Sequence, residues 1–128
     1  MMKSPALLVL CAVATLGALA PAPAQAADGP RYPLFTTWAT NVNARTGVPG
    51  SMACPEHPSP ANCPTVRGQS QPGDQLAVVC QTRGEHVGTN PNWVFAENRT
   101  RGFEGFMASY YIKHPDDWLP GVPQCYGP

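Results

Sequence analysis

Four aromatic residues in the second half of the chain have side chains that could bind another molecule. Tyrosine and tryptophan join a flat apolar face to a hydrogen-bonding group, which suits the recognition of a peptide in a groove. The candidate ligand-binding residues are Trp93, Phe106, Tyr110 and Tyr111. The alternative is that Trp93 belongs to the hydrophobic core and that Tyr111 packs one end of the fold.

The cysteines offer cross-linking chemistry. One of the five, Cys11, lies in an N-terminal apolar run, and the others are Cys54, Cys63, Cys80 and Cys125. Four cysteines in a small secreted domain predict two disulfides. Of the three possible connectivities we favour Cys54–Cys63 and Cys80–Cys125, because Cys54 and Cys63 share one Pro-rich segment that has no other means of ordering itself. The competing zinc site lacks the short spacing of structural zinc ligands.

Residues that could support catalysis or hold a metal are scattered. The histidines, at positions 57, 86 and 114, fall in separate predicted loops without metal-site spacing. A glycosidase carboxylate pair needs a carboxyl of raised pKa in a deep cleft, for which so small a domain has little room. Disulfide-bonded cysteines supply no thiolate, and neither a Gly-x-Ser-x-Gly elbow nor a glycine-rich phosphate loop occurs. The sequence therefore predicts a protein that is not an enzyme and that has no cofactor and no metal.

The N-terminus predicts export. Residues 1–26 contain Lys3, an apolar run from Ala6 to Ala20 and small residues at Ala24 and Ala26, which is the pattern of a secretory signal peptide. The apolar run is shorter than the roughly 20 residues that span a bilayer. Cleavage leaves one near-neutral domain, without the charge pattern that binds nucleic acid or an anionic membrane. We expect a monomer that is secreted, either extracellular or associated with the cell wall.

Short strands must position these side chains, and the best patterned one runs from Gln75 to Thr82. It follows the turn Pro72-Gly73-Asp74, and its period of two places Leu76, Val78 and Cys80 on the inner face. The other predicted elements are strands at 36–45 with Val42 and Ala44 inward, at 65–68 with Val66 inward, at 93–95 and at 105–109, a helical turn at 110–112, and irregular segments at 51–64 and 83–92. Such short strands between glycine and proline turns indicate a small antiparallel barrel or sandwich.

The order of these segments resembles one known family. Val42 to Gly47 looks like the opening strand and turn of bacterial Src-homology-3 (SH3b-type) domains, and Val66 to Gly68 with Pro72 to Val78 resembles their second and third strands. Trp93 to Phe95 matches the fourth strand, and Gly105 to Ile112 is similar to the closing segment. The first long loop is expanded and contains Cys54 and Cys63, and Phe106 stands where the family has tryptophan.

The resemblance implies an all-β fold, a small five-stranded SH3-like barrel over residues 40–112. A lead-in at 27–39 precedes it, and a Pro-rich tail at 113–128, tethered by the second disulfide, follows it. In this fold Met107 faces the core and Phe106 faces outward, and we expect Trp118 of the tail to cover the barrel flank.

The resemblance also implies a function, that of a secreted, non-catalytic bacterial binding module. Its expected partner is a cell-wall peptide or an extracellular protein, recognised through an aromatic groove. The alternative is a small inhibitor of an extracellular enzyme that acts through the Cys54–Cys63 loop, because a loop stiffened by prolines and closed by a disulfide loses little entropy on binding.

Overall fold

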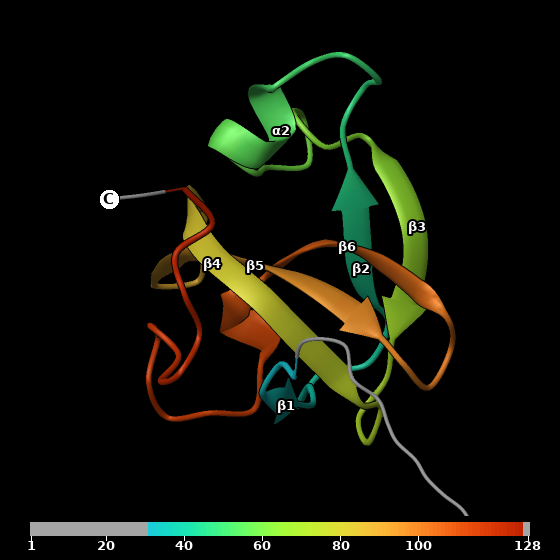
Figure 1. Cartoon of the computed structure of the whole chain (residues 1–128), viewed down its shortest axis with the longest axis vertical. Coiled ribbons are helices and arrows are strands. Elements are labelled where there is room, and N and C mark those ends of the chain that lie inside the picture. The colour runs from blue at the N-terminus through green and yellow to red at the C-terminus, as the bar shows by residue number, and fades with distance from the viewer. Residues whose placement is uncertain (1–30, 127–128) are drawn as a thin grey trace, which may run out of the picture. The chain divides into compact units, whose positions relative to one another are not determined.

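The computed structural model describes residues 31–126 as an all-β domain (Figure 1). The predicted signal peptide, residues 1–26, and the first part of the predicted lead-in lie outside the described residues. One antiparallel sheet in the order β1-β4-β5-β6-β2-β3 curls into a half-barrel. No helix within residues 31–126 is long and apolar enough to cross a membrane.

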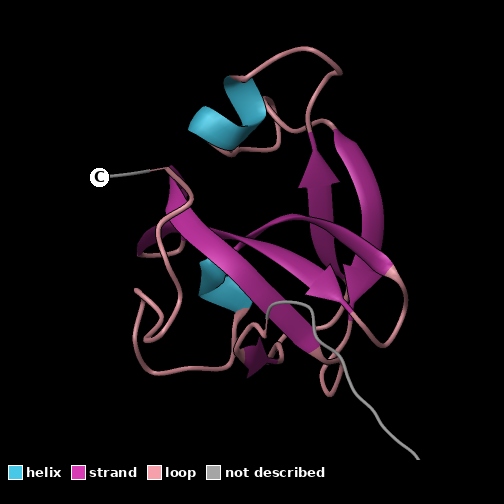
Figure 2. Ribbon diagram, in the orientation of Figure 1, coloured by secondary structure: helices cyan, strands magenta, loops and turns pink. Residues whose placement is uncertain are grey.

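The strands carry most of the regular structure of the described residues, and the two helical segments are short (Figure 2). The strands are β1 (Leu34–Phe35), β2 (Val42–Thr46), β3 (Thr65–Ser70), β4 (Leu76–Val87), β5 (Asn90–Asn98) and β6 (Phe103–Ala108). The helix α2 (Ala53–Glu56) lies in the loop between β2 and β3, and the 3₁₀ turn η3 (Ser109–Tyr111) follows β6. The predicted helical turn therefore begins one residue earlier than expected.

The core has two parts that lie on different sides of the sheet's central strands. The larger cluster contains Leu76, Val78, Val94 and Met107 together with residues of the tail. The smaller cluster gathers Trp93 and Phe106 around the Cys54–Cys63 disulfide. Strand faces were partly predictable: the expectations that Val42, Ala44 and Met107 point inward are confirmed.

The expected strand at 75–82 lies in β4, but its alternation stops at a β-bulge between Val78 and Cys80. A bulge places one extra residue opposite its partner strand, so the faces of the strand exchange beyond it. Gln81 is consequently buried and Cys80 only half-buried. The prediction that Cys80 ends the inner face is therefore wrong.

Residues 83–92 were expected to be irregular, but they form the end of β4 and the start of β5. Gly88, with a φ of 59°, lies in the turn between these strands. The inward prediction for Val66 is also wrong, because it lies on β3, an edge strand, and is exposed. The first predicted strand, 36–45, is a strand only from Val42 onward, in β2. Residues 38–41 form a bend, in which Asn41 has a φ of 54°.

The C-terminal tail completes the larger cluster. Leu119 and Val122 are buried in it. Trp118, which was expected to cover the barrel flank, is 42% exposed. The buried amide of Gln81 holds the tail in place: its Nε2 donates to the carbonyls of Leu119 and Val122, each at 2.8 Å, and its Oε1 accepts from the Leu119 backbone N–H at 2.8 Å. The Cys80–Cys125 disulfide then ties the end of the tail to β4.

A buried carboxylate organises the turns that precede β4 and follow β5. Asp74 Oδ2 accepts hydrogen bonds from Arg101 Nε at 2.6 Å, from Asn98 Nδ2 at 2.9 Å and from the Gln71 backbone N–H at 2.9 Å. Burial by itself raises the pKa of Asp74, but these hydrogen bonds and the Arg101 charge outweigh it, so the pKa lies below its ordinary value. The ionised form of Asp74 is therefore part of the folded structure.

Candidate binding groove

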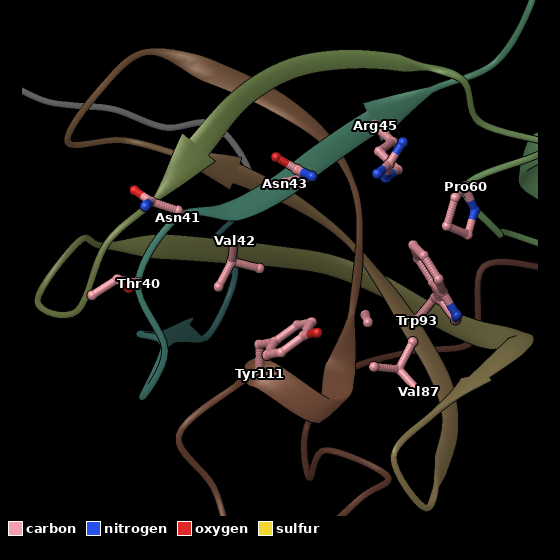
Figure 3. Close-up of a pocket in the computed structure, with 10 residues that line it drawn as sticks. Thr40, Asn41, Val42, Asn43, Arg45, Pro60, Val87, Trp93 and Tyr111 are labelled. Atoms are coloured by element: carbon pink, nitrogen blue, oxygen red, sulfur yellow. The ribbon is translucent and has the colours of Figure 1, made fainter.

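A groove opens where β2 separates from β6. The two strands share a single paired position, Arg45 with Phe106. Beside it they pass so closely that a Cβ atom on Gly105 would lie 2.8 Å from the backbone nitrogen of Arg45. The resulting groove has a volume of about 210 Å³ and is lined by Thr40, Asn41, Val42, Asn43, Arg45, Pro60, Val87, Trp93, Ala108 and Tyr111 (Figure 3).

The apolar side of the groove is rigid. Trp93 is only 3% exposed, and its indole N–H donates to the backbone carbonyl of Glu85 at 2.8 Å. Figure 3 shows Trp93 and Tyr111 on the side of the groove that faces β2, with Val87 near Trp93. The Trp93 ring is thus fixed by packing and by a hydrogen bond.

Next to the groove lies an exposed aromatic cluster formed by Trp38, Tyr110 and Tyr111. Their ring centroids are 5.6 Å apart for Trp38 and Tyr110, 5.8 Å for Trp38 and Tyr111, and 5.3 Å for the two tyrosines. The Trp38 indole N–H donates to the Tyr110 carbonyl at 2.8 Å. Trp38 remains 51% exposed and Tyr110 37% exposed. Because Tyr111 also lines the groove, the cluster extends the apolar surface that a ligand would meet.

The four residues predicted to bind a ligand do not all meet in the groove. Trp93 and Tyr111 line it, and Tyr110 lies beside it over the β4–β5 turn, where its ring packs against Gly88. The prediction that Phe106 faces outward is wrong, since it is 7% exposed and its ring packs edge-on against Phe95 at 5.1 Å. The expanded disulfide loop covers this face of the sheet, so both faces of β6 are buried.

The opposite rim, along β2, carries hydrogen-bond donors. Asn41 Oδ1 accepts from Gln71 Nε2 at 2.7 Å, and Asn43 Oδ1 accepts from Gln69 Nε2 at 3.0 Å. The side-chain nitrogens of Asn41 and Asn43 have no acceptor among the described residues. Arg45, further along the strand, contacts the Cys63 carbonyl at 3.4 Å. The side-chain oxygens of Asn41 and Asn43 are therefore already hydrogen-bonded to glutamines, whereas their side-chain N–H groups are not used in the part of the chain that the structure describes.

The disulfide loop forms the end wall of the groove. Its Cys54–Cys63 bridge is buried, and the Pro58 carbonyl accepts from the Glu85 backbone N–H at 2.9 Å. Pro60 of the same loop reaches the groove near Trp93 and Arg45 (Figure 3). The predicted connectivity, Cys54–Cys63 and Cys80–Cys125, is confirmed. The segment from 51 to 64, expected as an irregular loop, contains the short helix α2.

Four groove or near-groove residues were not predicted: Trp38, Asn41, Asn43 and Arg45. All four fall in the predicted strand 36–45, where only the alternation of Val42 and Ala44 carried a signal. A tryptophan in this segment was the one available hint, since tryptophan is enriched among residues that dominate binding. Within residues 31–126, no group of three His, Cys, Asp or Glu side chains is close enough to hold a metal ion.

No protein-family model, no curated protein and no solved structure matches the chain in comparisons with known proteins.

Proposed function

We propose that the protein is a secreted, non-catalytic binding module that recognises cell-wall peptide in the groove between β2 and β6. The observation that carries the proposal is the groove itself: a fixed apolar side of Trp93 and Tyr111 faces a rim of unused hydrogen-bond donors. Apolar and donor surfaces facing each other suit a peptide, which presents side chains on one side and carbonyl oxygens along its length. The alternative occupant of the same groove is an extended segment of an extracytoplasmic protein.

The size of the groove favours a peptide over a small-molecule cofactor. Its volume of about 210 Å³ is below the roughly 300–1,000 Å³ that is usual for small-molecule pockets. The lining residues contribute amides, hydroxyls, a guanidinium group and aromatic rings, and none of them is His, Asp, Glu or Cys. These groups bind through shape and hydrogen bonds, which supports recognition without chemistry.

The proposed family is that of bacterial Src-homology-3 domains. Supporting features are the curled antiparallel sheet, its five longer strands β2 to β6, and the 3₁₀ turn that directly follows β6. Two disulfides support the proposed export, because such bridges persist in oxidising compartments.

The alternative function, inhibition of an enzyme by the Cys54–Cys63 loop, has weaker support. Pro58 and Ser59, in the middle of this loop, are buried, and the Pro58 carbonyl is bonded to Glu85 of β4. A loop held against its own sheet has little free length to insert into a cleft.

The proposal is tested by sedimenting the protein with insoluble peptidoglycan at moderate salt. We expect the unmodified protein in the pellet and Tyr111→Ala to bind at least several-fold more weakly, because truncation of an aromatic anchor removes a central contact. Tyr126→Ala, which removes an exposed tyrosine outside the groove, is the matched control and should bind normally. Near-ultraviolet circular dichroism checks that each variant is folded. Unmodified protein that stays entirely in the supernatant would overturn the proposal.

A further inference from the structure

The groove has a charge asymmetry. Arg45 is the only charged residue among its lining residues. No carboxylate of the described residues lies within 4.0 Å of the Arg45 guanidinium, since the ion pairs found in residues 31–126 involve Arg99, Arg101 and His114. The groove therefore holds a positive charge that its own walls do not neutralise.

The position of Arg45 directs that charge into the groove. Its backbone is held in the tight crossing with Gly105 of β6, and its guanidinium contacts the Cys63 carbonyl of the disulfide loop at 3.4 Å. In Figure 3 it lies at the Pro60 end of the groove, across from Trp93. A planar guanidinium of this kind pairs with a carboxylate through two parallel hydrogen bonds.

The rim along β2 adds further hydrogen-bond donors to the Arg45 guanidinium. The Asn41 and Asn43 oxygens are bonded to Gln71 and Gln69, so these amides offer N–H groups to a ligand. Together with Arg45 they form a row of donors with no negatively charged group opposite. A ligand that fits this row must supply acceptors, and a negative charge at the Arg45 end.

We propose that the groove selects a peptide that carries a free carboxylate, which pairs with Arg45 while the peptide's carbonyls accept from Asn41 and Asn43. The inference rests on the proposed function, peptide binding in this groove, and adds the charge of the ligand to it. Neutral or cationic peptides bind more weakly because they leave Arg45 without a partner in a site partly shielded from water.

The test compares two forms of one probe. Soluble fragments of peptidoglycan, stripped of phosphate-containing polymers, are used with their carboxylates free or converted to methylamides. Calorimetric titration of the full, disulfide-bonded protein should give at least tenfold weaker binding for the amidated fragments. The Arg45 Nε–Hε resonance should shift on titration with the free-carboxylate fragments alone.

Variants of Arg45 assign the selectivity to this residue. Arg45→Gln should bind both probes equally and weakly, and Arg45→Lys should recover part of the preference for the free carboxylate. Arg99→Gln, at an exposed position in the turn after β5, is the matched control and should behave like the unmodified protein.

The outcomes separate the two proposals. Equal binding of both probes by the unmodified protein would overturn the carboxylate preference and leave peptide binding in place. If neither probe binds, both the inference and the proposed function fail. Displacement of the fragments by acetate at the same carboxylate concentration would show an unspecific anion site and would also overturn the inference.

Discussion

The Cys54–Cys63 bridge joins residues nine apart in a single loop, whereas the Cys80–Cys125 bridge spans 45 residues and ties the tail to β4. The first bridge is fully buried beside Trp93 and Phe106, and the second is half-buried at the surface. One disulfide is thus part of the hydrophobic core, and the other lies partly exposed to solvent.

The contacts around each bridge explain the difference. The loop contributes Pro60 to the groove and the Cys63 carbonyl to Arg45, so the first bridge shapes the groove. The tail contributes Leu119 and Val122 to the larger core cluster and bonds to Gln81, so the second bridge completes a core. Removing the Cys54–Cys63 bridge should therefore mainly weaken binding, and removing the Cys80–Cys125 bridge should mainly lower stability.

The largest expected effect comes from Cys80→Ser combined with Cys125→Ser. This disulfide closes a long loop, so its loss should lower the free energy of unfolding by about 4 kcal/mol in the chain-entropy model. Urea denaturation monitored by tryptophan fluorescence measures the change. Protein that remains folded should still sediment with peptidoglycan. A folded double variant that no longer binds would show that the tail also shapes the groove.

Cys54→Ser combined with Cys63→Ser should have a smaller effect on stability and a larger one on binding. Because this disulfide closes a shorter loop, its removal should lower the free energy of unfolding by about 2.5–3 kcal/mol. Peptidoglycan binding should weaken at least tenfold, because the loop wall and the Cys63 carbonyl beside Arg45 lose their fixed positions. Sedimentation of the folded fraction, with the other serine pair as control, measures this. Unchanged binding would remove the distinction between the two bridges.

The smallest effect is expected at Asp74, which ties chain segments together without a covalent bond. The pKa of Asp74 is lowered in the folded protein. Its ionised carboxylate therefore adds its full share to the free energy of unfolding above the ordinary carboxyl pKa. That share is lost as the pH falls through the lowered pKa of the folded protein. Asp74→Asn should cost about 2 kcal/mol at neutral pH.

Urea denaturation at several pH values measures the Asp74 effect. The difference in the free energy of unfolding between Asp74→Asn and the unmodified protein should be largest at neutral pH and should become small in acid. The stability losses caused by the two pairs of serine substitutions should not change with pH. A gap that does not change with pH would show that the charge of Asp74 contributes nothing.

Local patterns predicted the parts of the fold that depend on neighbouring residues. The Pro-rich spacing of Cys54 and Cys63 indicated the correct disulfide pairing, and alternation identified the inward faces of Val42, Ala44 and Met107. Alternation failed at Cys80, because a bulge depends on the partner strand as well as on the strand itself.

The errors at Phe106 and in residues 83–92 both concern segments that contact the disulfide loop. Phe106 packs in the cluster around Cys54 and Cys63, and the Glu85 backbone N–H donates to the Pro58 carbonyl. The loop buries the Phe106 face of β6, whereas residues 83–89 are mostly exposed and lack the apolar alternation by which strands are recognised. The covering loop is distant in sequence, so no local pattern reports it.

Composition, spacing and local alternation were enough to predict the all-β class, the two disulfides and a set of candidate aromatic residues. The tertiary structure alone decided which aromatics meet in the groove, and it placed Arg45, Asn41 and Asn43 opposite them. The groove exists because β2 leaves β6 after one paired position. That divergence is set by contacts between segments far apart in the chain, which spacing along the sequence does not encode.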